Sequence, residues 1–183
     1  MKTINTLRQI INALYFSLLA VAVGAILFFS ALFFFTESLP IYLKGYAMLF
    51  QFFSWQIHLV PIATGINFML FIISIHALRS CISSFTESDF YTVAVIKHLK
   101  RAGSLFIFIG LSTILVLCIS AIHTLGITHN LLQLNAFIPF LIDVAAAIDL
   151  KSTFLIIIGL FFVLFSKSFE HASRLKQENE LTI

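Results

Sequence analysis

The sequence predicts an all-α membrane protein: four transmembrane helices arranged as two hairpins, with the N and C termini both cytoplasmic. Of its 183 residues, 60% are hydrophobic and only 10% are charged, whereas a soluble domain is nearer half apolar and a quarter charged. Uncharged runs recur that approach or exceed the ~20 helical residues needed to cross a bilayer core of about 30 Å. Lysine and arginine also gather on one side of the resulting topology. We therefore expect a single integral membrane domain over residues 1–183.

The first hairpin is predicted from two apolar runs. The run at 10–35 carries no charge and is much longer than the ~7–15 apolar residues of a signal peptide, so we interpret it as a retained spanning helix. The segment Thr36-Glu37-Ser38-Leu39-Pro40 is expected to end this helix, because Pro40 disfavours helical geometry at Leu39. The second span is expected at 55–78, where Pro61 falls in the first turns and costs least.

The second half of the chain is predicted to contain two further spans, an outer loop between them and a soluble tail. In chain order these occupy residues 104–124 (span), 125–146 (loop), 147–168 (span) and 169–183 (tail). The last span is the shortest in uncharged residues, because Lys151 and Lys167 enclose it. We expect the Lys167 side chain to reach the inner membrane surface along its apolar stem.

A polar, basic segment at residues 79–103 separates the hairpins and is predicted to be a cytoplasmic hinge. Residues 86–89 offer a helix N-cap with an acid three positions later. A helix starting there has an apolar face at Tyr91, Val95 and Leu99 and a separate basic face at Lys97, Lys100 and Arg101. That pattern is typical of an interfacial segment with cations toward anionic headgroups. Docking of a partner's acidic surface is the functional alternative.

Orientation follows from the basic residues. Of the 11 lysines and arginines, all but Lys44 and Lys151 fall on the termini and the hinge. The positive-inside rule therefore places both termini in the cytoplasm. The net charge of +3 reflects this topology, and we expect no direct nucleic-acid binding.

Several segments together resemble the YoaS-like family of bacterial inner-membrane proteins with four spans and a domain of unknown function. They are Ser84-Phe85-Thr86, Lys97-His98-Leu99-Lys100-Arg101-Ala102-Gly103, Phe169-Glu170-His171-Ala172, Leu175, and Glu178-Asn179-Glu180-Leu181-Thr182-Ile183. Ser84 stands where that family usually has proline. The resemblance implies a partner, a small helix-turn-helix regulator often encoded beside such proteins. It implies no enzymatic activity, no cofactor and no catalytic residue.

Within the predicted spans, Asn67 is the one strongly polar side chain at depth, with Thr64 and Ser74 near the same side of the helix. Such groups bond to neighbouring helices more often than they bind a substrate. Cys81 and Cys118 match no metal or redox spacing, and we expect two free thiols. An outer cluster of His58, His123, His129, Asp143 and Asp149 is the weakest candidate, because no pair has zinc-motif spacing. We therefore predict no bound metal.

Two functions follow from these features. The first is a sensor or tether that acts on a cytoplasmic regulator through the basic face and the acidic tail residues Glu178 and Glu180. The alternative is a small transporter or permease-like subunit working as an oligomer. An enzyme is not expected, since the sequence offers no phosphate-binding loop, nucleophile motif or carboxylate pair.

Overall fold

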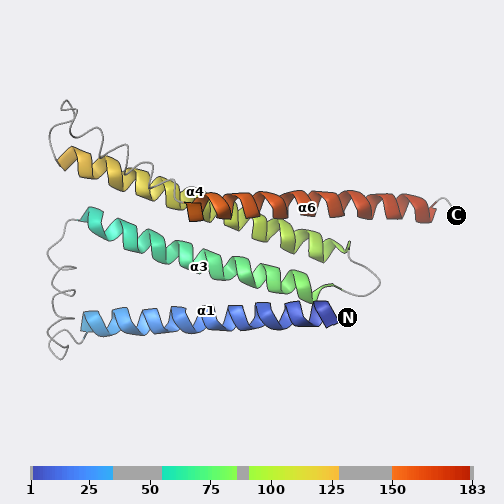
Figure 1. The fold of residues 1–183 in the computed structure, drawn as a ribbon, viewed down its shortest axis with the longest axis horizontal. Helices are drawn as coiled ribbons and strands as arrows, with labels where there is room; N and C mark the ends of the chain where they lie inside the picture. Colours follow the sequence, from blue (N-terminus) through green and yellow to red (C-terminus); the bar gives the residue numbers. More distant parts are fainter. Residues whose placement is uncertain (1, 35–54, 86–90, 128–149, 182–183) are drawn as a thin grey trace.

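The computed structural model describes residues 2–34, 55–85, 91–127 and 150–181. They form four α-helices: α1 (Lys2–Phe34), α3 (Trp55–Ser83), α4 (Val93–Ile127) and α6 (Leu150–Leu181). In these ranges there is no strand, and each helix is long and apolar enough to cross a membrane. The predicted all-α fold with four such helices is thus confirmed. The start of α1 and the end of α6 lie at the same end of the molecule (Figure 1).

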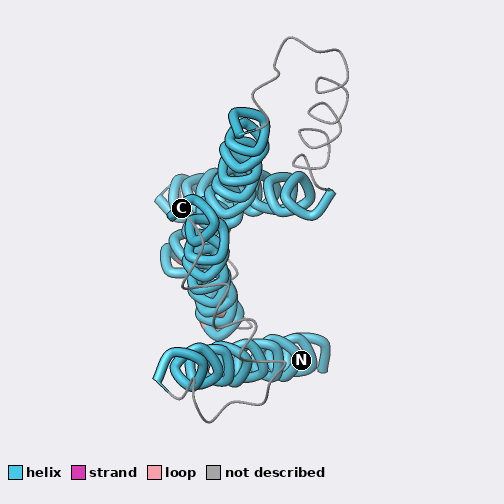
Figure 2. The backbone as a smooth tube through the Cα atoms, turned by 90° about the vertical axis from the view of Figure 1, so that its left-hand side faces the viewer, coloured by secondary structure: helices cyan, strands magenta, loops and turns pink. Residues whose placement is uncertain are grey.

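The helices form a four-helix bundle in which packing follows chain order. Helix α1 packs against α3, α3 against α4, and α4 most extensively against α6. Viewed from the end, α1 lies at one edge of the bundle (Figure 2). Among its described side chains only Ala22 is buried. Most of the apolar surface of α1 therefore faces outward, as suits a helix surrounded by lipid.

Helices α4 and α6 meet backbone to backbone at two glycines. A Cβ atom built on Gly103 would lie 2.7 Å from the carbonyl oxygen of Gly159, and one built on Gly159 would lie 2.7 Å from the oxygen of Gly103. A second close approach lies farther along, where a Cβ on Gly110 would be 2.7 Å from the oxygen of Ser152. Glycine is required at these points because any larger residue would separate the helices.

The small residues of this seam recur with heptad spacing. On α6 they are Ser152, Gly159 and Ser166, and the Ser166 hydroxyl donates a 3.0 Å hydrogen bond to the Ile96 carbonyl of α4. Both Ser152 and Ser166 are buried. A spacing of seven residues keeps one face of a helix on its partner when the pair supercoils with a left-handed twist. Lipid tails are as apolar as these side chains, so the hydrophobic effect does not drive helices together inside the bilayer. Close packing of this kind drives helix association instead.

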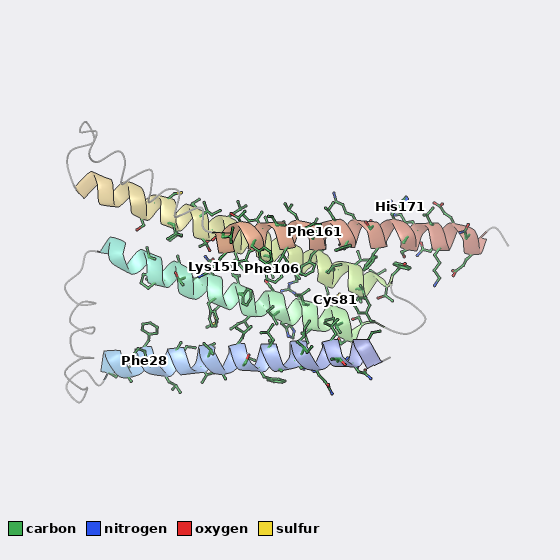
Figure 3. All side chains as sticks on the ribbon, viewed as in Figure 1. Phe28, Cys81, Phe106, Lys151, Phe161 and His171 are labelled. Carbon is green, nitrogen blue, oxygen red and sulfur yellow. The ribbon has the colours of Figure 1, made fainter. Side chains whose placement is uncertain are left out.

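An aromatic contact joins α3, α4 and α6. The ring of Phe106 on α4 lies 5.8 Å from that of Phe71 on α3 and 5.8 Å from that of Phe162 on α6. Phe106 is buried, and Figure 3 shows it in the middle of the bundle. Ring pairs at this separation contribute about 0.5–1.5 kcal/mol beyond the area they bury.

The hinge differs from its prediction in where its helix begins. Tyr91 and Thr92 precede α4, and the Thr92 hydroxyl accepts a 3.4 Å hydrogen bond from the backbone N–H of Val95. Thr92 is therefore the N-cap of α4. The cap expected at residues 86–89 lies outside the described residues. From there α4 continues without a break into the predicted third span.

Helix α6 likewise continues through most of the segment expected to be a soluble tail and ends at Leu181. The expected outer loop at 125–146 is described only as far as Ile127, where α4 ends.

Candidate functional site

The basic face of α4 consists of Lys97, Lys100 and Arg101, and all three side chains are exposed. In the described part of the chain none of them makes an ion pair. The opposite face of this turn is anchored, because Val95 and Ala102 are fully buried. The cations are thus presented on a helix that cannot rotate without exposing its core.

The anchor beneath the basic face is a small apolar cluster. Cys81, Val95 and Leu99 form its buried centre, and Leu78, Phe85, Phe162 and Phe169 pack around it. Cys81 lies where the last turns of α3 meet the first turns of α4 (Figure 3), with its sulfur 3.8 Å from the Val95 carbonyl oxygen. The ring of Tyr91 lies 5.4 Å from that of Phe169 on α6. Contacts from two helices, α3 and α6, therefore fix the start of α4.

The α6 tail, residues 167–181, extends along the same end of the molecule (Figure 1). Its charges pair along the helix: Arg174 with Glu170 at 2.7 Å, and Lys176 with Glu180 at 4.0 Å. Exposed pairs of this spacing contribute only about 0.3–0.5 kcal/mol. The structure does not bring the predicted tail residues Glu178 and Glu180 onto the basic face of α4, whose cations have no ion-pair partner among the described residues.

The three predicted polar residues of α3 differ in whether their hydrogen bonds reach another helix. Asn67 is buried, and its Nδ2 donates a 3.1 Å hydrogen bond to the Thr113 hydroxyl of α4. Thr64 and Ser74 instead donate to carbonyls one turn earlier in α3, those of Val60 and Leu70. Asn67 is therefore the member of the trio that links two helices.

Sequence reasoning missed a polar cleft between α1 and α3. It has a volume of about 440 Å³ and is lined by Arg8, Asn12, His76, Arg79, Ser80 and Ser83. A signal was present, because Arg8 and Arg79 border the apolar runs of two neighbouring helices on the same side. Only the packing of α1 on α3 brings the six side chains together.

Thiols and histidines give no metal site in the described residues. Cys81 is buried, Cys118 is partly buried, and both are free. No group of three or more His, Cys, Asp or Glu side chains there could hold a metal ion. The predicted outer cluster cannot be placed: His129, Asp143 and Asp149 fall outside the described residues, as do the side chains of His58 and His123.

Four spanning-length apolar helices with a basic, polar end define a multi-pass α-helical membrane protein. Residues 42–183 match the family described as protein of unknown function (DUF2975), and the chain belongs to that family. The match takes in α3, α4 and α6 and begins after α1. No curated protein and no solved structure matches the chain.

Proposed function

We propose that this protein is an inner-membrane sensor or tether that holds a cytoplasmic transcriptional regulator at the membrane. The partner is a small helix-turn-helix protein, as the YoaS-like resemblance of the hinge and the carboxyl terminus implies. The docking surface combines the basic face of α4 with the α6 tail. Both lie at the end of the molecule that the positive-inside bias assigns to the cytoplasm.

The observation that carries the proposal is the exposure of Lys97, Lys100 and Arg101 with no ion pair among the described residues. A fixed group of like charges attracts an oppositely charged partner over about 8 Å at physiological salt and orients it on arrival. The buried Val95 and Ala102 hold these cations in place. A partner therefore meets a preformed surface and loses little conformational entropy in ordering it.

The α6 tail supplies a second contact of a different kind. Leu175 remains 48% exposed in a tail whose other described side chains are mostly charged or polar. Glu178 and Glu180 are exposed near the end of the same helix. A regulator that binds both surfaces needs an acidic patch for α4 and a cationic or apolar patch for the tail.

The test is capture of the regulator encoded beside this chain by the tagged, detergent-solubilised full-length protein. Charge reversal at Lys97, Lys100 and Arg101 should reduce capture roughly tenfold, as expected for three surface charges worth about 0.5 kcal/mol each. Raising the salt concentration should weaken wild-type capture in the same direction, because the attraction is screened.

The control reverses Arg8, an exposed cation on α1 outside the docking surface, and should leave capture near the wild-type level. Labelling of a cysteine introduced near Lys97 should confirm that neither variant inverts in the membrane. Capture that is equal in both variants and the wild type would refute docking through α4. A third variant, with Glu178→Lys and Glu180→Lys, measures how much the α6 tail contributes to capture of the regulator.

A further inference from the structure

We propose that the cleft between α1 and α3 binds a phosphate group, either the phosphodiester of a phospholipid headgroup or a free phosphate. This goes beyond the proposed regulator docking and uses other residues. Arg8 and Asn12 come from α1, and His76, Arg79, Ser80 and Ser83 come from α3. The volume of about 440 Å³ lies within the range of ~300–1,000 Å³ typical of small-molecule sites.

The positive charge of the cleft is not neutralised by the protein. Neither Arg8 nor Arg79 makes an ion pair in the described part of the chain. The described carboxylates, Glu170, Glu178 and Glu180, all lie on α6, whereas the cleft lies between α1 and α3. Two guanidinium groups bordering one cavity match the oxygens of a phosphate, which they can bind through paired N–H donors.

Arg79 is already oriented for such a role. Its guanidinium carbon lies 5.2 Å from the ring centre of Tyr15 and 5.3 Å from that of Phe16, both on α1. Cation–π contacts of this length hold the group by its face and leave the N–H donors at its edge free to bond. The ring of Tyr15 also lies 5.5 Å from that of His76. The α1 aromatics thus position two of the lining side chains.

Asn12 adds a requirement for a hydrogen-bond donor in the ligand. Within the described residues its Oδ1 atom is buried and accepts no hydrogen bond. A buried acceptor without a partner is costly, so a bound group that offers a donor is favoured. A phosphodiester with a neighbouring hydroxyl or ammonium satisfies the arginines and Asn12 together, as phosphatidylglycerol does.

The position of the cleft favours the lipid as the source. Arg8 stands just before the apolar run of α1, and Arg79 stands just after that of α3, which is the level of the headgroups. Beside the cleft, Phe16 of α1, whose ring contacts the Arg79 guanidinium, is 58% exposed. An acyl chain can follow this apolar surface while its phosphate stays between the arginines.

The experiment measures lipid retention by the delipidated full-length protein in native mass spectrometry. The probes are phosphatidylglycerol, phosphatidylcholine (which has no headgroup donor) and inorganic phosphate. We expect the wild type to retain phosphatidylglycerol best. The double variant Arg8→Gln, Arg79→Gln should bind it at least about tenfold more weakly, the loss of one charge-assisted hydrogen bond. Asn12→Ala should reduce the preference over phosphatidylcholine.

The matched control is Arg174→Gln, Lys176→Gln, which removes the same charge from the α6 tail, away from the cleft, and should retain phosphatidylglycerol like the wild type. Arg8→Gln alone serves if the double variant folds poorly, because Arg8 is exposed and circular dichroism can verify its helices. Phosphate-dependent thermal stabilisation of the wild type but not of the Arg8 variants, without lipid retention, would assign the site to free phosphate. The proposal would be overturned if the arginine variants bound phosphatidylglycerol and inorganic phosphate as well as the wild type does.

Discussion

The close backbone contact between α4 and α6 at Gly103 and Gly159 gives the sharpest structural prediction, and Gly159→Ala tests it. The added Cβ would lie 2.7 Å from the Gly103 oxygen, 2.7 Å from Ile107 Cγ1 and 2.9 Å from the Ile107 backbone nitrogen. Two of these three atoms belong to the backbone of α4 and cannot rotate away. The substitution must therefore move α6 off α4.

The cost can be worked from that displacement. A carbon contact is relaxed at about 3.5–4.0 Å, so the helices must part by roughly 1 Å, which forfeits about half of each dispersion contact beside the glycines. Overpacking of this kind costs ~1–3 kcal/mol. The 3.0 Å hydrogen bond from Ser166 to the Ile96 carbonyl stretches with it. The higher helix propensity of alanine offsets up to about 1 kcal/mol of this loss of stability.

The control is Gly24→Ala on α1, because a Cβ there meets nothing within 4 Å. It receives the propensity gain without the clash. The difference between the two variants isolates the packing cost, which we expect to be about 1–3 kcal/mol. The assay is reversible unfolding in mixed micelles, followed by helical circular dichroism against the mole fraction of dodecyl sulfate. If Gly159→Ala matches Gly24→Ala to within about 0.5 kcal/mol, the two helices do not meet at these glycines.

Two further substitutions test single hydrogen bonds in the same unfolding assay. Asn67→Ala should cost about 0.6–2 kcal/mol because it removes the link to Thr113 of α4, whereas Thr64→Ala, which removes a bond within α3 alone, should cost less; an equal loss from both would refute the link. Thr92→Ala should cost about 0.5–2 kcal/mol by leaving the Val95 N–H without its cap, and Thr92→Ser should restore most of it. If serine rescues nothing, the Thr92 hydroxyl is not the cap.

Much of the helical architecture was predictable because hydrophobicity is a property of segments. Each helix owes its existence to its own run of apolar residues, which the bilayer selects by length. The apolar face at Val95 and Leu99 was predictable for a similar reason, since helical spacing alone places them together. Both are buried. Asn67 also stood out in the sequence, because a strongly polar side chain in a long apolar run requires a partner.

Sequence alone thus determined that the chain is all-α, with four helices able to cross a membrane. The tertiary structure decided which surfaces exist between those helices. The partner of Asn67, the opposition of Gly103 and Gly159, and the meeting of Arg8 with Arg79 each depend on how two helices are placed side by side. These pairs lie far apart in the chain, and no local spacing encodes their approach. Helix packing in lipid depends on shape and on a few polar contacts, which appear only when both surfaces are present.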